Sequence, residues 1–217
     1  MVADPRRALG WSTLLLVATV AVCGLVWSTD TRAALQWVDD HFLSLMERLR
    51  WTPLVDAAKA LAFIGGTWVT WSVRAVVLVV LAWRQRWLHL TAFVLAVATS
   101  EVLIGVLKDA YDRPRPSGSL ITTSGSSFPS GHAVAGAVTA VGLVIVLLPP
   151  GHTRWAWERR AALYASLMAL SRTYLNAHWL SDVVAGGLLG STLAIGWPAL
   201  LVTYRVWLTD HRQRASR

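Results

Sequence analysis

The sequence predicts an all-α membrane protein with six transmembrane helices, and three observations lead to this fold class. Hydrophobic residues make up 55% of the 217 residues and charged residues only 15%, whereas soluble domains carry about a quarter charged residues. The hydrophobic residues occur in long runs, and about twenty of them in a row cross a bilayer as a helix. No linker or low-complexity stretch divides the chain, so we expect a single domain over residues 1–217.

Six segments fit a membrane span, and the fifth of them is the shortest. They are Ala8–Val26, Thr67–Trp83, Trp87–Asp109, Ser130–Leu148, Arg160–Leu175 and Ser181–Trp207. The first is longer than the core of a signal peptide, so we interpret it as an uncleaved span. Several tryptophans lie near the predicted span ends, as interfacial anchors do. Examples are Trp11, Trp27, Trp83, Trp87 and Trp207.

The charges of the connecting segments predict the orientation. With six spans both termini lie on one side, and the segments on that side hold far more arginine than acidic residues, whereas the segments on the other side are balanced. The positive-inside tendency then predicts cytoplasmic termini. Compactness and the lack of eukaryotic targeting signals favour a bacterial inner membrane. The net charge of +8 is dispersed along the chain, so we do not expect a nucleic-acid partner.

The first outer segment has an amphipathic pattern. Its hydrophobic residues recur at steps of three and four, which is typical of a helix with one apolar face. They are Leu35, Val38, Phe42, Leu45 and Leu49. We expect this helix to lie on the outer leaflet. Two interpretations stay open: a lid or lateral gate for a lipid, and a helix packed over the span ends.

Three polar clusters interrupt the apolar chain, namely Lys108–Pro116, Pro129–His132 and Ser171–Asp182. The predicted topology puts all three at the outer ends of spans, so they can meet in one pocket. The clusters supply three cations that suit the oxygens of a phosphate group, and arginine adds planar bidentate recognition. These cations are Lys108, Arg115 and Arg172.

The remaining polar residues suit phosphoryl transfer. Ser130 and Gly131 open a predicted helix, whose free backbone N–H groups form an anion site. His178 precedes Asp182 by one helical turn, so the carboxylate can orient and stabilise the imidazole as a nucleophile. His132, beside the phosphate site, is then the acid that protonates the leaving oxygen. Such a pair predicts a bell-shaped pH profile.

The combined pattern resembles a known family. Lys108-x6-Arg115-Pro116, Pro129-Ser130-Gly131-His132 and Ser171-Arg172-x5-His178-x3-Asp182 follow one another along the chain. This order resembles the type 2 phosphatidic acid phosphatases, or lipid phosphate phosphatases, and in particular their bacterial membrane-bound branch. All eleven fixed positions of the family pattern are present.

The resemblance implies a role for each motif residue. It implies that His178 is transiently phosphorylated, that Asp182 supports it and that His132 protonates the leaving group. It implies that the phosphoryl oxygens are held by Lys108, Arg115, Ser130, Gly131 and Arg172. It also implies hydrolysis without a metal or another cofactor. Arg113-Pro114 duplicates the Arg-Pro pair, and we assign Arg115 because it keeps the spacing from Lys108.

Several functions remain open. The leading hypothesis is a phosphatase acting on a lipid phosphate in the membrane, with polyprenyl (undecaprenyl) diphosphate preferred because an outward site suits recycling of that carrier. Phosphatidic acid, diacylglycerol diphosphate and phosphatidylglycerol phosphate are alternatives. A vanadium-dependent haloperoxidase, whose site resembles this one, and a non-catalytic channel or transporter are remote alternatives. The sequence does not give the oligomeric state.

Two further features lie inside the predicted spans. Arg74 and Glu101 are charges in costly positions, and we expect them to form an ion pair between the second and third spans. Gly186, Gly190 and Ala194 follow Asp182 at four-residue intervals. This stripe of small residues predicts close packing of the last span against its neighbours.

Overall fold

The structure is a computed structural model and describes residues 1–215, so residues 216–217 of the predicted domain lie outside the described residues. Its regular elements within this range are all α-helices. They are α1 (Pro5–Trp27), α2 (Thr29–Arg48), α3 (Thr52–Ile64), α4 (Thr67–Trp83), α5 (Trp87–Tyr111), α6 (Gly131–Leu147), α7 (His152–Tyr174) and α8 (Leu180–Ala215).

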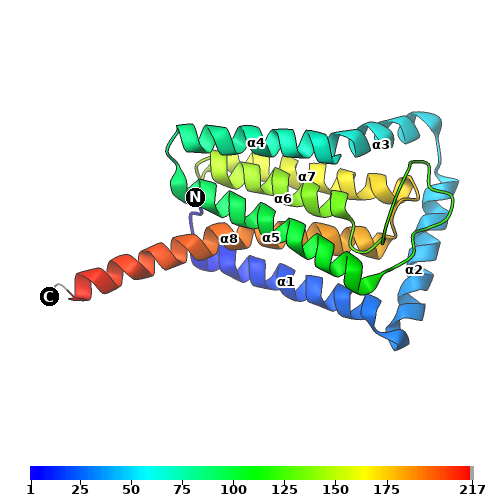
Figure 1. The fold of residues 1–217 in the computed structure, drawn as a ribbon, viewed down its shortest axis with the longest axis horizontal. Coiled ribbons are helices and arrows are strands. Elements are labelled where there is room, and N and C mark those ends of the chain that lie inside the picture. Colours follow the sequence, from blue (N-terminus) through cyan, green and yellow to red (C-terminus); the bar gives the residue numbers. More distant parts are fainter. Residues whose placement is uncertain (216–217) are drawn as a thin grey trace.

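Six of these helices form an elongated bundle. Helices α1 and α4 to α8 run along its length, and α2 crosses one end beside the loop that joins α5 to α6 (Figure 1). Both termini lie toward the other end, where α8 extends beyond its neighbours (Figure 1). The polar loops between α5 and α6 and between α7 and α8 are therefore gathered at the end that α2 covers.

Each of the six predicted spans overlaps one long helix, and α4 has the predicted bounds, but α7 begins at His152 rather than Arg160 and α8 continues past Trp207 to Ala215. Only α1, α5 and α8 among the described residues are both long and apolar enough to cross a membrane alone. Helices α3 and α4 pass this test together but bend by 47° at the break between them. Helix α6 has 17 residues, about 26 Å at 1.5 Å per residue, which is a little less than a hydrocarbon core of about 30 Å.

Two local expectations need correction. Helix α3 was not anticipated, because its sequence lies between the predicted amphipathic helix and the second span. A helix, α2, forms over the segment with the amphipathic pattern, but its buried residue is Asp39 rather than a member of the apolar stripe. Val38, Leu45 and Leu49 are exposed. The face that packs on the bundle is therefore partly polar, and its partners are described below.

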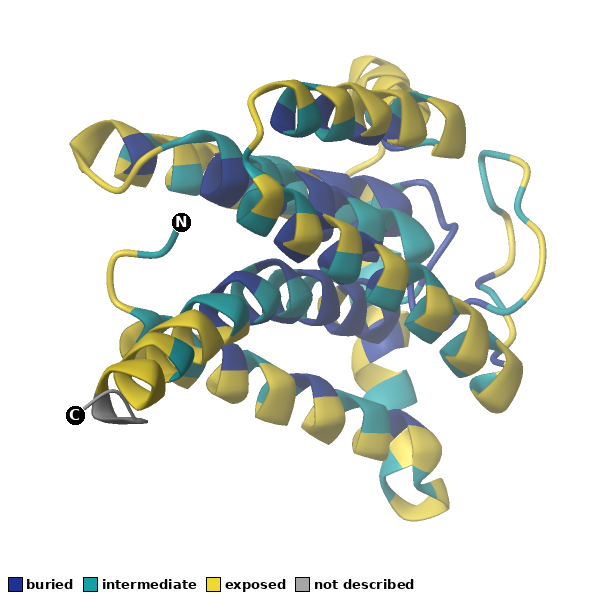
Figure 2. Ribbon diagram, turned by 60° about the vertical axis from the view of Figure 1, so that its left-hand side comes forward, coloured by how far each residue is buried: buried dark blue, intermediate teal, exposed yellow. Residues whose placement is uncertain are grey.

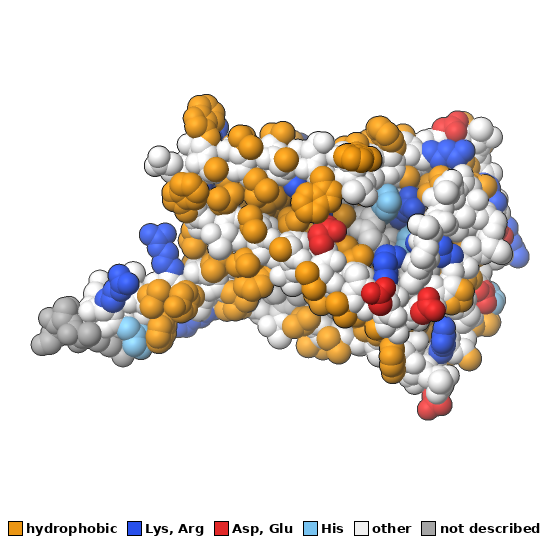
Figure 3. Space-filling view, in the orientation of Figure 1, with side chains coloured by type: hydrophobic (Ala, Val, Ile, Leu, Met, Phe, Trp, Pro, Cys, Tyr) orange, Lys and Arg blue, Asp and Glu red, His pale blue; other side chains and the backbone are white. Residues whose placement is uncertain are grey.

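The outer surface of the bundle is apolar. Buried residues gather on the inward faces of the helices, especially α6 and α8, while the outward faces are exposed (Figure 2). Hydrophobic side chains cover much of the face in Figure 3, and Trp68, Trp83 and Phe63 are among the most exposed. Exposed apolar surface of this extent is typical of contact with lipid. The protein is an integral membrane protein.

Helices α6 and α8 pack closely because glycine faces the contact, as the stripe of small residues predicted. A Cβ atom at Gly186 would lie 2.8 Å from the Ser130 carbonyl oxygen, and one at Gly190 would lie 2.5 Å from that of Val134. Both distances are too short for a real Cβ contact. The contact holds the start of α6, where Ser130 and Gly131 lie, against the first turns of α8.

We expect Gly190→Ala to lower the free energy of unfolding by about 1–3 kcal/mol, the usual cost of overpacking. The added methyl group meets the backbone of α6, which cannot move aside without separating the helices. Gly187→Ala is the matched control, because nothing lies within 4 Å of a Cβ atom there. Thermal unfolding in detergent checks the pair, and equal midpoints would contradict this view of the contact.

Candidate active site

The motif residues converge at the end of the bundle that α2 covers. His178 lies in the turn between α7 and α8, and Asp182 lies in the first turn of α8. Lys108 and Arg172 lie in the last turns of α5 and α7, and His132 lies in the first turn of α6. Helix ends and loops therefore bring together side chains that are far apart in sequence. In Figure 3 histidine and basic side chains gather in a hollow at this end.

Asp182 lies near His178 for a different reason from the one expected. His178 precedes α8, so the two residues are not one turn apart on a common helix. Asp182 Oδ2 accepts the backbone N–H of Trp179 at 2.9 Å. This contact is one half of a capping box, in which an acidic residue at the third helical position reaches back to the residue before the helix. The cap folds the turn so that His178 Nδ1 lies 3.5 Å from Asp182 Oδ2.

The hydrogen bonds of His178 fix its tautomer. Nδ1 lies 2.7 Å from the Ser127 carbonyl oxygen, which can only accept, so Nδ1 carries the proton. Nε2 lies 3.1 Å from Arg115 Nη1 and is left with its lone pair. The carbonyl of Ser127 therefore orients the ring, and Asp182 contributes mainly its charge. The nitrogen available for attack on phosphorus is Nε2.

Arg113 forms the centre of a buried polar network that the sequence did not predict. Its Nη1 donates to Asp182 Oδ1 at 2.7 Å, and its Nη2 donates to Asp39 Oδ2 at 2.8 Å. Asp39 also accepts the backbone N–H and the hydroxyl of Ser181. Arg113 is only 3% exposed. The network ties α2 to the start of α8, which favours the interpretation of α2 as a helix packed over the span ends.

Arg113 and Arg115 bind different partners. Arg115 donates to several loop carbonyls, among them those of Gly125 and Ala177, and reaches His178 with the same guanidinium group. Lys108 Nζ donates to the Ser126 carbonyl. Burial lowers the pKa of Arg115, and the charge of Asp182 opposes that shift. Both cations are therefore held by backbone oxygens of the same loop.

Two side-chain atoms at this end are buried without any hydrogen-bond partner. They are Arg172 Nε and Ser130 Oγ, and one other such atom, Arg74 Nη2, occurs among the described side chains. Ser130 is the residue before the first turn of α6 and makes no side-chain cap. The first N–H groups of a helix also lack intrahelical partners. The start of α6 and Arg172 therefore offer several unused donors, an arrangement that suits an anion.

His132 lies in the first turn of α6, near the turn that carries His178. It interacts electrostatically with Arg172, His178 and Arg115 and makes a hydrogen bond with the backbone of Ala62. The break between α3 and α4 passes directly over it, because a Cβ atom at Gly65 would lie 3.3 Å from His132 Cδ2 and closer still to Met168. The sequence pattern did not predict that Gly65 lies against His132.

The predicted ion pair inside the bundle is confirmed. Arg74 Nη1 lies 2.6 Å from Glu101 Oε1, which joins α4 to α5. Arg74 Nε also donates to Thr139 on α6 at 3.0 Å. Three helices are therefore linked by one buried guanidinium group.

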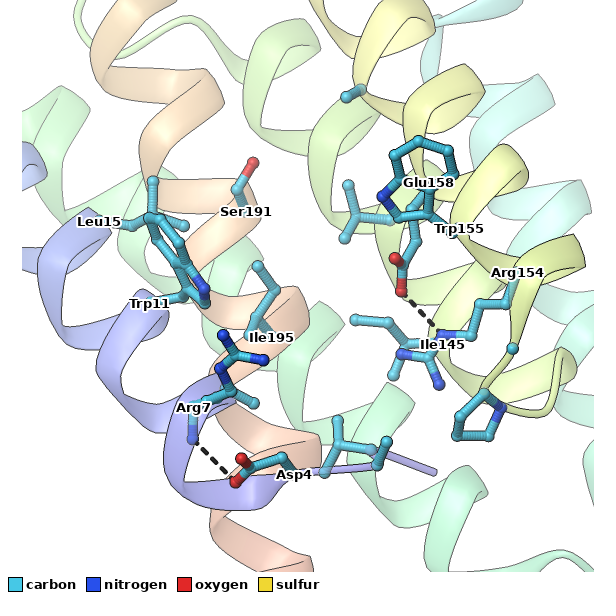
Figure 4. A pocket seen from close by; sticks show the side chains of 17 residues that line it. Asp4, Arg7, Trp11, Leu15, Ile145, Arg154, Trp155, Glu158, Ser191 and Ile195 are labelled. Atoms are coloured by element: carbon cyan, nitrogen blue, oxygen red, sulfur yellow. Dashed lines mark hydrogen bonds and ion pairs between the residues drawn. The ribbon is translucent and has the colours of Figure 1, made fainter.

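A cavity of about 710 Å³ lies elsewhere, between the first turns of α1 and helices α6, α7 and α8. Three of its charged side chains, those of Asp4, Arg154 and Glu158, have partners (Figure 4). Arg154 binds Glu158, and Asp4 accepts the backbone N–H of Arg7. None of the motif residues lines this cavity. It is therefore separate from the histidines and their cations.

Comparison with known proteins agrees with this geometry. The family model of the PAP2 superfamily matches residues 89–208, which contain every motif residue. The chain belongs to the PAP2 superfamily.

Relatives within the superfamily act on different lipids. An undecaprenyl-diphosphatase of Sulfolobus acidocaldarius is 40% identical over 68 residues, 31% of this chain and 30% of that protein. Phosphatidylglycerophosphatase B of Bacillus subtilis is 33% identical over 118 residues, 51% of this chain and 57% of that protein. The chain thus spans about a third and a little over half of the lengths of these two relatives.

A solved structure shares the fold. The crystal structure of a transmembrane PAP2-type phosphatidylglycerolphosphate phosphatase from Bacillus subtilis superimposes with a TM-score of 0.77. The match covers 87% of this chain and 94% of that chain at 22% sequence identity. The all-helical membrane fold is therefore that of the superfamily.

The environment of His178 predicts where activity is lost in acid. Burial lowers the pKa of His178 to about 4; Arg115 and Arg172 lower it as well, and Asp182 raises it. Because a lowered pKa keeps the ring neutral above that value, protonation removes the nucleophile only as the pH falls through about 4. We expect the acid limb of kcat/KM, which reports the free enzyme, near pH 4. Asp182→Asn should move it to lower pH, and a limb that moves to higher pH would contradict this assignment.

The network around Arg113 predicts a loss of stability. Arg113→Gln leaves Asp39 and Asp182 buried without their cation, and breaking a buried ion pair costs about 3–5 kcal/mol. We expect a lower unfolding temperature and lower activity, because Asp182 is no longer fixed beside His178. Arg48→Gln, at the exposed end of α2, is the control. Equal stability of the two variants would show that the network is dispensable.

Proposed function

We propose that the protein is a single-domain phosphatase of membrane lipid phosphates that works through a phosphohistidine intermediate without a metal. The observation that carries this proposal is the pair of buried, unpartnered polar atoms, Arg172 Nε and Ser130 Oγ, near the unprotonated Nε2 of His178, which accepts from Arg115. A buried donor without a partner costs free energy. An anion bound between them removes that cost, and a phosphoryl group is the anion that a histidine nucleophile attacks.

The reaction follows from the positions of these groups. The phosphoryl oxygens bind Arg172, Ser130, the N–H groups at Gly131, Arg115 and Lys108. His178 Nε2 attacks phosphorus, and the bond from phosphorus to the lipid oxygen breaks while His132 donates a proton to that oxygen. Water then attacks the phosphohistidine with His132 as base, which releases inorganic phosphate and restores both histidines. Asp182 stabilises the positive charge on His178 throughout.

The cations take the place of a metal in this scheme. In the proposed complex three positive side chains and a helix N-terminus surround the phosphoryl group and supply the electrostatic stabilisation of the transition state. Arg115 is in addition oriented by the loop carbonyls that it binds. A rigid cation next to the nucleophile needs little reorganisation when the phosphoryl group is transferred.

We propose six membrane spans, with α3 and α4 forming one broken span, cytoplasmic termini and the active site on the outer face of a bacterial inner membrane. The charge distribution of the sequence and the common end of both termini support this topology. Polyprenyl diphosphate is the preferred substrate class, since an undecaprenyl-diphosphatase is among the relatives. Phosphatidylglycerol phosphate, the substrate type in the name of the Bacillus subtilis relative, is the second candidate.

The test is phosphate release by the purified protein in detergent with a metal chelator present. The panel contains a polyprenyl diphosphate, phosphatidic acid and phosphatidylglycerol phosphate. We expect release that is abolished in His178→Ala, because the variant has no nucleophile. His152→Ala is the matched control, since this exposed residue begins α7 at the other end of the bundle and should leave the rate unchanged.

The ranking of rates identifies the substrate class. Release that persists in His178→Ala would remove the phosphohistidine mechanism. No release from any lipid by folded protein would remove the proposed function. Bromide oxidation with added vanadate would then be the next assay.

A further inference from the structure

A small chamber adjoins the candidate active site on the side of His132. Its volume is about 200 Å³, roughly the space of six or seven waters, and it lies between α4, α5, α6 and the turn that joins α3 to α4. It is lined by Gly65, Thr67, Thr70, Trp71, Arg74, Glu101, Ile104, Gly131, His132 and Ala135. The lining includes His132 but not His178, Arg115 or Arg172. The chamber is therefore next to the proposed acid and separate from the cations around the nucleophile.

Arg74 is the cation of this chamber, and one of its donors is unused. The side chain is only 1% exposed. Nη1 binds Glu101, Nε binds Thr139, and the guanidinium lies 5.1 Å from the ring centroid of Trp71. Nη2 is buried with no hydrogen-bond partner. It shares this condition with Arg172 Nε and Ser130 Oγ, the two unpartnered atoms at the phosphoryl site, so the same reasoning assigns it an anionic ligand.

The order of the groups indicates which part of a substrate reaches Arg74. The transferred phosphoryl group lies against His178, and His132 protonates the oxygen that leaves it. Whatever is bonded to that oxygen extends past His132 into the chamber. Glu101, which lines the chamber, is 39% exposed. The chamber thus continues toward lipid, where an apolar tail can leave it.

We propose that this chamber is a second phosphate subsite, in which Arg74 binds the inner phosphate of a lipid diphosphate while the outer phosphate is transferred to His178. The hydroxyls of Thr67 and Thr70 are further donors in the lining. Glu101 neutralises Arg74 when the subsite is empty. In the reaction the bond from the outer phosphorus to the bridging oxygen breaks, and His132 protonates that oxygen, so the lipid monophosphate leaves through the chamber. This inference rests on the proposed function.

The experiment compares farnesyl diphosphate with farnesyl monophosphate, which share one tail and differ only by the inner phosphate. The main variant is Arg74→Gln with Glu101→Gln, because it removes both charges and leaves neither unpaired. Loss of a charged hydrogen bond costs about tenfold or more in binding. We expect kcat/KM to fall at least about tenfold for the diphosphate and to change little for the monophosphate. Arg84→Gln, at the exposed end of α4, is the control and should change neither.

Glu101→Gln alone is a second variant and keeps Arg74 hydrogen-bonded. It removes the negative charge that competes with the substrate for Arg74, so KM for the diphosphate should fall while KM for the monophosphate stays constant. A merely structural tie between α4 and α5 predicts instead an equal loss on both substrates together with a lower unfolding temperature. That outcome, or a loss confined to phosphatidylglycerol phosphate, would overturn the subsite. Wild-type protein inactive on every lipid phosphate would overturn the proposed function itself.

Discussion

The structure of the end of the bundle that α2 covers depends on one buried guanidinium group, that of Arg113, held between Asp39 and Asp182. Taking three charges out of water is costly, and only direct pairing with full hydrogen bonding offsets that cost. The arrangement has a geometric effect, because the three residues belong to α2, to the loop after α5 and to the start of α8. Their pairing therefore sets the position of the carboxylate beside His178. Helix α2 is tied to the site by this polar contact, while Leu35 of its apolar stripe packs against Val26, Phe128 and Ala185.

The remaining polar groups divide into those that have hydrogen-bond partners and those that have a buried atom without one. Arg113 and Arg115 have partners for most of their donors, and these partners are carboxylates in one case and loop carbonyls in the other. Arg172, Ser130 and Arg74 each retain a buried atom without a partner. Satisfied groups determine the shape of the loops, and unsatisfied groups mark where an anion adds binding energy. In the cavity near the N-terminus, by contrast, Arg154 pairs with Glu158, and Asp4 accepts backbone N–H groups.

The sequence predicted most of the helices and that the motif residues gather at one end of the bundle. Long apolar runs favour helices, so most ends of the six segments were found within a few residues, whereas the polar start of α7 and the polar end of α8 were not. The spacing from Lys108 was the basis for assigning Arg115 rather than Arg113 to the family motif. The orientation of His178 was not predictable, because its partner is the backbone carbonyl of Ser127, which every residue type has. Asp39 was missed because a buried carboxylate in an amphipathic pattern is indistinguishable from a solvated one until its partner, from a distant segment, is known. Helix α3 was missed because its short apolar sequence is too brief for a span.

The side chains proposed to act on the phosphoryl group lie at helix ends, and this position has a consequence for how such an enzyme meets its substrate. Ser130, Arg172 and His178 all lie where a helix begins or ends, while the apolar sides of the same helices face lipid. A lipid headgroup can reach these three side chains by diffusing in the plane of the membrane, with its tail never leaving the hydrocarbon. The quantity that sets the turnover is then the mole fraction of substrate in its own leaflet. Diluting the substrate with inert lipid slows such an enzyme even when the amount of substrate per millilitre stays the same.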